Sequence, residues 1–290
     1  SIGPHYSLAR PSIFLLPMNR EPIILTQNQD LLPLGSYVTD VREYFNVLEF
    51  HPKVVVDALR DAKLENSHIG VELGQEQRMG IPVGSYLELV KLMPKAQFVD
   101  AAEIIVQLRM VKSEEELDYI RQAADVTGRA RQRLFDKHIV PGMTERDVIR
   151  TLRGLIQQEG GDRTSFAFLH HGLLGFAQTF PYERPLVKGT VLGIDAGAFV
   201  RMYTVDYCRF AVLGKATDEQ KQTHEAVKKI SNKMAEALRP GITCSEIHRV
   251  GAKAIEDEGS IISHPQKLSG RSRMGHGQGM LFTEPPSITP

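Results

Sequence analysis

A stretch of helix-capping sequence occurs twice in the chain, at an offset of 99 residues. Pro-Gly-Met-Thr at positions 141–144 returns as Pro-Gly-Ile-Thr at 240–243, and the agreement continues without a gap to Glu-Gly at 159–160 and 258–259. Each copy has a Pro-Gly turn, a threonine able to cap a helix, an acidic residue three positions later, an apolar helix and a closing glycine. Two unrelated helices with good caps can share this order, but ungapped agreement at both ends favours a duplicated unit.

An amphipathic helix is expected before each copy. Ser113 and Glu116 form a capping-box pattern that starts the first helix, which we expect to run to about Lys137, and the second helix starts at Thr217. The chain after residue 110 is therefore predicted to contain a helix–helix–sheet arrangement twice. A functional site would form where the two halves meet.

The first part of the chain alternates short apolar runs with amphipathic segments. We expect a strand pair at 12–16 and 22–25, further strands at 69–73 and 97–99, and helices at 54–64 and 85–92. This alternation is typical of an α/β domain in which helices pack on a mixed sheet. The predicted organisation is an N-terminal domain over residues 1–110 and a second domain over 111–290.

Composition argues against several classes of function. Lys and Arg total 35, as do Asp and Glu, so the formal net charge is zero, and no run of like charge indicates a nucleic-acid-binding surface. The two cysteines, Cys208 and Cys244, fit a reducing compartment better than a disulfide scaffold. No apolar run is long enough to span a bilayer, so we expect a soluble, cytoplasmic protein without nucleic-acid or membrane partners.

Two aspartates lie on neighbouring predicted strands. Asp195 ends the run Leu-Gly-Ile-Asp at 192–195, and Asp206 begins a segment in which alternate residues share one face. A hairpin turn near residues 200–201 would place the two carboxylates directly opposite each other, with their Cβ atoms about 4.5–5.5 Å apart. Carboxylates held that close in a core repel, so either one is protonated or a cation lies between them, and we favour the cation. With a turn elsewhere both would be surface residues, which their apolar neighbours argue against.

A histidine follows in a glycine-rich motif. His276 stands within Gly-His-Gly-Gln-Gly at 275–279, where glycines allow the backbone to approach a ligand or another strand closely. Alone, such a loop with an incidental histidine is a weak signal. Together with Asp195 and Asp206 it supplies two carboxylates and an imidazole, a ligand set suited to Mn, Co, Fe or Zn.

These motifs resemble those of the pita-bread family, which includes aminopeptidase P, prolidase, methionine aminopeptidase and creatinase. The resemblance rests on Asp-Ala-Gly at 195–197, Tyr-Thr-Val-Asp-Tyr-Cys-Arg at 203–209 and the motif around His276, and residues 109–116 look like the junction into the family's catalytic domain. It implies a mixed α/β fold, with a creatinase-type N-terminal α/β domain before a pseudo-duplicated pita-bread domain. It also implies a homodimer, a peptide or small amide substrate, and amide hydrolysis by a metal-activated water.

The resemblance also assigns metal ligands. The family holds two divalent ions with two Asp, one His and two Glu, and the first three correspond to Asp195, Asp206 and His276. Family peptidases usually carry two accessory histidines, whose positions are occupied here by Gln178 and Thr283. Neither side chain carries a proton as an imidazole does.

His170 and His171 lie near the first of these positions in the sequence, and substitution by one of them is an open alternative. The catalytic residues themselves stay unassigned.

The two glutamate ligands of the family are expected beyond the end of this sequence. Adding the repeat offset to Asp195 puts the second hairpin near position 294, whereas the sequence ends at Pro290. Glu284 belongs to the preceding motif and is a poor substitute ligand. We therefore expect a pita-bread domain that is incomplete at its C-terminus and an N-terminal domain that is trimmed as well. A paired metal site would then be weak or empty in this stretch of chain.

Three functions are compatible with these features. The first is a metal-dependent peptidase of the Xaa-Pro aminopeptidase or dipeptidase type, with a substrate preference shifted by Gln178 and Thr283. The second is a metal-free, creatinase-like C–N hydrolase, which the presence of all three testable ligands opposes. The third is a non-catalytic binding protein, which the two replaced histidines favour and the paired aspartates oppose, because buried like charges without a cation are costly. We expect the first.

Overall fold

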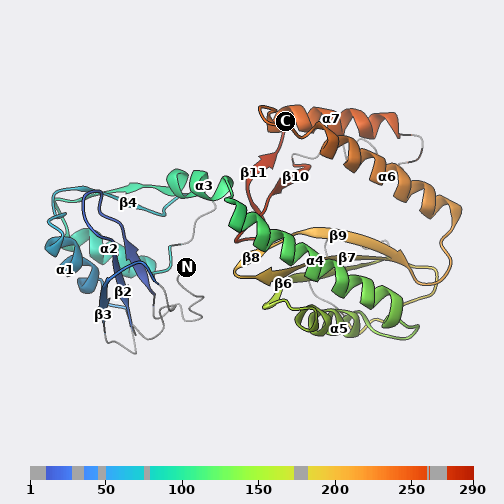
Figure 1. Ribbon diagram of the computed structural model, residues 1–290, viewed down its shortest axis with the longest axis horizontal. Helices are drawn as coiled ribbons and strands as arrows, with labels where there is room; N and C mark the ends of the chain where they lie inside the picture. Colours follow the sequence, from blue (N-terminus) through green and yellow to red (C-terminus); the bar gives the residue numbers. More distant parts are fainter. Residues whose placement is uncertain are drawn as a thin grey trace. The chain divides into compact units, whose positions relative to one another are not determined.

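The computed structural model describes residues 11–27, 36–44, 50–74, 79–172, 182–259, 261 and 273–290, and the chain divides into two compact units, Ser1–Leu108 and Arg109–Pro290 (Figure 1). Helix α3 (Ala102–Met110) runs through the point of division. Each unit has its own cluster of buried apolar side chains. No helix in the part of the chain that the structure describes is long and apolar enough to cross a membrane.

In the first unit, the described strands form two small sheets. β1 (Ile13–Leu15) pairs antiparallel with β2 (Ile23–Thr26), and β2 runs parallel to β3 (Asp40–Glu43). β4 (His68–Val71) and β5 (Gln97–Asp100) form a separate parallel pair, and the helices are α1 (Lys53–Asp61) and α2 (Val83–Leu92). The predicted strands and helices are confirmed, but the prediction of one mixed sheet is wrong for the described residues. β4, α2 and β5 follow one another along the chain, and a helical crossover is the connection that a parallel pair requires.

The described part of the second unit contains a four-stranded sheet, two helix pairs and a two-stranded ribbon (Figure 1). Its elements in chain order are α4 (Glu114–Lys137), α5 (Glu145–Gln158), β6 (Arg163–His171), β7 (Val191–Val200), β8 (Tyr203–Thr204), β9 (Tyr207–Val212), α6 (Asp218–Ala237), α7 (Cys244–Asp257), β10 (Gly275–Gly277) and β11 (Glu284–Ile288). β7 is the central strand: β6 pairs antiparallel with one edge, while β8 and β9 pair one after the other with the opposite edge. β10 and β11 pair antiparallel outside this sheet.

Alternation along β7 separates a core face from a site face. Leu192, Ile194 and Ala196 are buried and belong to a cluster that includes Leu134 of α4 and apolar residues of α5. The intervening residues of β7 point away from these helices, because successive side chains of a strand point to opposite faces. Asp195 is one of them, so the packing of its apolar neighbours fixes the face on which its carboxylate lies.

The helical part of the repeat is confirmed. α5 and α7 are both 14 residues long, and each begins with a complete capping box, built on Thr144 and Thr243 respectively. The glycines of the two Pro-Gly turns have matching positive φ angles, +86° at Gly142 and +89° at Gly241. α4 and α6 precede them and also begin with capping boxes, so the same local chemistry starts all four helices.

Candidate metal centre

The hairpin that carries the first aspartate turns later than predicted. Val200 pairs with Tyr203, so Arg201 and Met202 form a two-residue turn in which both φ angles are positive, at +49° and +73°. The same register continues into β9, where Cys208 is the partner of Asp195. The position of the turn thus decides which side chains of the two strands meet.

The predicted direct pairing of Asp195 with Asp206 is therefore wrong. The register places Asp206 level with Gly197, in the break between β8 and β9, so that it is diagonal to Asp195. Diagonal neighbours in an antiparallel pair are about 7–8 Å apart, with their Cβ atoms somewhat closer. The two carboxylates do come together, since Asp206 is close enough to hydrogen-bond with Asp195.

The break between β8 and β9 depends on the absence of a side chain at Gly197. A Cβ atom there would lie 2.0 Å from the carbonyl oxygen of Val205 and 2.9 Å from Thr204 Oγ1. The backbone just before Asp206 therefore occupies the space that any other residue would need. Glycine in the Asp-Ala-Gly motif is thus explained by the close approach of the second aspartate's segment.

Asp195 is a largely buried carboxylate beside another carboxylate. Its Oδ1 atom has no hydrogen-bond partner among the described residues. Burial and the neighbouring Asp206 raise the pKa of Asp195 to about 7, while His276 and Arg131 act in the opposite direction. Such an arrangement favours either a shared proton or a bound cation.

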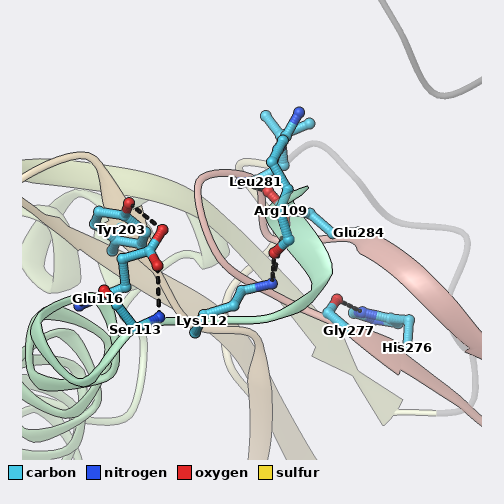
Figure 2. Close-up of polar contacts among 9 residues, drawn as sticks. All are labelled: Arg109, Lys112, Ser113, Glu116, Tyr203, His276, Gly277, Leu281 and Glu284. Atoms are coloured by element: carbon cyan, nitrogen blue, oxygen red, sulfur yellow. Dashed lines mark hydrogen bonds and ion pairs between the residues drawn. The ribbon is translucent and has the colours of Figure 1, made fainter. Parts of the chain in front are cut away.

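His276 approaches the same carboxylates from β10. Its Nδ1 atom lies 2.8 Å from the carbonyl oxygen of Gly277, and its Nε2 atom lies 3.2 Å from Asp206 Oδ2; Figure 2 shows the Gly277 contact. Because a carbonyl only accepts, Nδ1 carries a proton, and a neutral ring would point its Nε2 lone pair at the carboxylate. The hydrogen bond with Asp206 raises the pKa of His276. The lone pair of a neutral Nε2 atom and the carboxylate of Asp206 would repel each other, and a metal ion bound to both would remove this repulsion.

The glycine-rich segment is fastened to the break between β8 and β9. Gln278 Oε1 accepts a hydrogen bond of 2.8 Å from the backbone N–H of Asp206, and the carbonyl oxygen of Gly279 accepts one of 2.8 Å from Thr204. A Cβ atom at Gly277 would lie 2.5 Å from the carbonyl oxygen of Pro285. These close backbone approaches are what the glycines of the motif permit, and they bring His276 to Asp206.

The donor chemistry fits a divalent ion, with two carboxylates and an imidazole whose tautomer is set by a backbone carbonyl. As the described side chains stand, however, no group of three or more His, Cys, Asp or Glu residues is arranged to hold a metal ion. The structure brings Asp195, Asp206 and His276 together, and their role as ligands stays a prediction.

Glu284 is a buried acid whose role sequence reasoning missed. Its carboxylate forms a hydrogen-bonded ion pair with the guanidinium of Arg109 and lies 3.4 Å from Lys112 Nζ. It also accepts a 2.8 Å hydrogen bond from the backbone N–H of Leu281. It is thus committed to these partners, in keeping with its rejection as a substitute metal ligand. The signal in the sequence was the pair of cations in residues 109–112, but nothing there indicates a partner so far along the chain.

The accessory positions differ in what the structure says of them. Gln178 lies outside the described residues. Thr283 is half-buried in the turn that precedes β11. His171 belongs to the helix-covered face, where its Nδ1 atom is 3.1 Å from Glu145 Oε1, so the alternative that His171 serves the site is wrong. His170 pairs with Gly193 of β7 and shares the face of Asp195, so this alternative stays open for His170.

Residues 118–290 match the model of metallopeptidase family M24. The chain belongs to this family. An Xaa-Pro dipeptidase of Pyrococcus horikoshii is 26% identical over 215 residues, which cover 72% of this chain and 58% of that protein. The crystal structure of an X-Pro aminopeptidase from Thermotoga maritima has a TM-score of 0.79 at 23% identity and covers 96% of this chain and 75% of its own. That of a prolidase from Thermococcus sibiricus has a TM-score of 0.81 at 21% identity, covering 99% and 75%.

These likenesses confirm the predicted fold class for this M24 chain, a mixed α/β pita-bread architecture. The chain spans 58% of the length of the Pyrococcus horikoshii relative and 54% of a second Xaa-Pro dipeptidase, from Pyrococcus furiosus.

Proposed function

We propose that this M24 chain carries part of the active site of a metal-dependent peptidase that hydrolyses an amide bond next to proline. The observation that supports it is the convergence of Asp195, Asp206 and His276 from three separate segments on one face of the sheet. The relatives named as Xaa-Pro dipeptidases and an X-Pro aminopeptidase indicate the substrate class.

In this proposal, Asp195 and Asp206 hold metal through their carboxylate oxygens and His276 through Nε2. A bound divalent ion supplies a nucleophilic water at neutral pH and polarises the scissile carbonyl. The chain itself supplies orientation: the Gly277 carbonyl fixes the tautomer of the His276 ring, and Gln278 holds the backbone of Asp206. The metals that suit this donor set are Mn, Co, Fe and Zn, and a second ion would need carboxylates in addition to these three residues.

We also propose that residues 1–110 belong to a creatinase-like N-terminal domain and residues 111–290 to the M24 catalytic domain, each of them incomplete. The peptide or small amide substrate would bind to the assembled protein, which we propose to be a homodimer. The two cysteines are unpaired, which fits a cytoplasmic location.

The second candidate is a non-catalytic binding protein, and Thr283 at an accessory position is the observation that favours it. A threonine hydroxyl does not exchange protons near neutral pH as an imidazole does. Against it stands the pair of Asp195 and Asp206, because a binding role gives no reason to bury two carboxylates side by side.

Metal content is the test of this proposal. We would measure it by elemental analysis on the protein as its gene encodes it, beside Asp206→Asn and the control Asp136→Asn. Asp136 lies on α4, where it accepts a hydrogen bond from Gln132 on the surface. About two equivalents of Mn, Co, Fe or Zn in the wild type and the control, lost in Asp206→Asn, would support a paired-metal peptidase. No bound metal after reconstitution with each ion would rule it out.

A further inference from the structure

Glu284 is held by two cations and is itself almost fully buried, whereas the side chain of Arg109 is 26% exposed. The side chain of Glu284 is 3% exposed and that of Lys112 is 10% exposed. Lys112 also donates to the backbone carbonyl of Arg109 (Figure 2). The two cations are therefore fixed to each other as well as to the acid. A buried carboxylate in such a network has one well-defined position, because moving it would leave buried charges unpaired.

Glu284 in turn fixes the turn that follows the glycine-rich motif. It accepts from the backbone N–H of Leu281, three residues before it, and its Oε2 atom would lie 2.9 Å from a Cβ placed on Gly279. The carboxylate therefore fills the inside of the turn between β10 and β11. This is the turn whose Gly279 carbonyl and Gln278 side chain bond to the segment that carries Asp206.

Residues just before α4 and in its first turns also hold the segment that carries Asp206. Glu116 accepts a 2.8 Å hydrogen bond from the hydroxyl of Tyr203 and a 2.7 Å hydrogen bond from the backbone N–H of Ser113 (Figure 2). The ring of Tyr203 stacks on Tyr119 of α4, with centroids 5.8 Å apart. Residues 109–119 thus contact the strand before Asp206 and the turn after His276.

We propose that Glu284 is a positioning residue for the metal centre, and that Arg109 and Lys112 are its anchors. Arg109 and Lys112, through Glu284, hold the turn after His276 in place. Glu116, which lies in the same stretch of residues 109–119, holds β8, the strand before Asp206. The contacts made by Arg109, Lys112, Glu116 and Glu284, which we call the frame, thereby fix the spacing of His276 and Asp206 without touching either side chain. This inference rests on the proposed metal-dependent function, although the frame itself consists of contacts in the chain.

A purely structural role is the alternative, and a second, half-buried acid that binds two cations offers a control. Glu159 closes α5 and also binds two cations, with Arg129 Nε at 2.9 Å and Arg133 Nη1 at 2.5 Å. Its side chain is 15% exposed, and it caps the C-terminal end of α5, which packs on α4 and β6. Glu159→Gln therefore removes a network of one acid and two cations, with Arg129 54% and Arg133 40% exposed, without touching the proposed frame.

The experiment compares Glu284→Gln, Lys112→Met, Lys112→Arg and Glu159→Gln in the protein as its gene encodes it. The Mn²⁺ dissociation constant is measured by titration calorimetry, and hydrogen exchange is measured over residues 203–208 and 274–288. We expect Glu284→Gln and Lys112→Met to weaken Mn²⁺ binding about 10- to 100-fold, the range found when residues behind metal ligands are replaced. Both should also speed exchange in the two segments, whereas Lys112→Arg, which keeps the charge, and Glu159→Gln should match the wild type.

Equal Mn²⁺ affinity in Glu284→Gln and the wild type would overturn the inference, as would equal losses in Glu284→Gln and Glu159→Gln. If the wild type binds Co, Fe or Zn but no Mn²⁺, that ion replaces Mn²⁺ in the titrations. If it binds none of the four ions, the proposed function fails, and exchange alone decides about the frame. Faster exchange of both segments in Glu284→Gln but not in Glu159→Gln would then support it, and any other pattern would reject it.

Discussion

At the scale of single residues, the site depends on positions where only glycine fits, because neighbouring backbone occupies the space of a Cβ atom. Gly197→Ala would drive a Cβ atom to 2.0 Å from the carbonyl oxygen of Val205, and the atom it meets is backbone that carries Asp206. We expect a loss of about 1–3 kcal/mol in the free energy of unfolding, as for overpacked cores, together with weaker metal binding. Chemical denaturation and Mn²⁺ titration would measure the two effects.

Gly154 of α5 provides the control for this substitution. A Cβ atom there meets nothing within 4 Å, so Gly154→Ala should instead stabilise the protein by about 0.5–1 kcal/mol, because alanine loses less conformational entropy in a helix. A Gly197→Ala protein as stable as the wild type would show that the approach of Val205 is not a constraint.

The sequence predicted which side chains come together better than it predicted their geometry. Asp195, Asp206 and His276 could be selected because their chemistry and glycine neighbours are visible in the chain. The register of the hairpin could not be predicted, because two-residue hairpin turns with positive φ angles usually contain Asn or Gly, whereas this turn consists of Arg201 and Met202. A long-range contact supports it, since Asp162 Oδ2 accepts a 2.7 Å hydrogen bond from the N–H of Arg201.

At the scale of secondary-structure elements, the starts of α4, α5, α6 and α7 were predictable, because each begins with a capping box, which is a local pattern. Helix α3, which has no such box in the sequence, was not predicted. The acid of the first box also gives a pH-dependent effect. The backbone N–H of Ser113, more than any other group, lowers the pKa of Glu116 below its ordinary value of 4.5. A lowered pKa means that the carboxylate stabilises the folded state above the unfolded pKa and that this stability is lost as the pH falls through the folded pKa.

Glutamine can still accept from the N–H of Ser113, as Gln220 accepts from that of Thr217 in α6, so Glu116→Gln removes only the charge. We therefore expect it to lower the free energy of unfolding by about 0.3–1 kcal/mol at pH 7, the range for a negative charge in the first turn of a helix. The difference from the wild type should shrink as the pH falls below 4.5, where the unfolded carboxylate takes up its proton. Urea denaturation across this pH range measures it. Glu114→Gln, in the same helical turn but outside the box, is the control, and an identical pH dependence in the two variants would contradict the assignment.

The repeat makes a second prediction about elements. Gly142 and Gly241 occupy the same place in the two Pro-Gly turns with φ angles of +86° and +89°, and neither would meet an atom within 4 Å of an added Cβ. Alanine at either position is thus penalised by backbone strain alone, which we expect to cost about 1–2 kcal/mol at both sites. Denaturation curves of Gly142→Ala and Gly241→Ala test this, and clearly unequal losses would show that the two turns are not equivalent.

At the scale of the whole molecule, the two units have separate cores, one around Val56 and Leu59 and the other around Leu134 and Ile194. The proposed ligands all belong to the second unit, Arg109–Pro290. A metal that binds only the folded form of a unit stabilises it by about 2.7 kcal/mol when the free ion is at 100 times its dissociation constant. Scanning calorimetry should therefore show two transitions, and Mn²⁺ should raise the midpoint of only one. Asp206→Asn should abolish that shift and leave the other transition in place, so a single transition, or a shift of both, would mean that the two units unfold together.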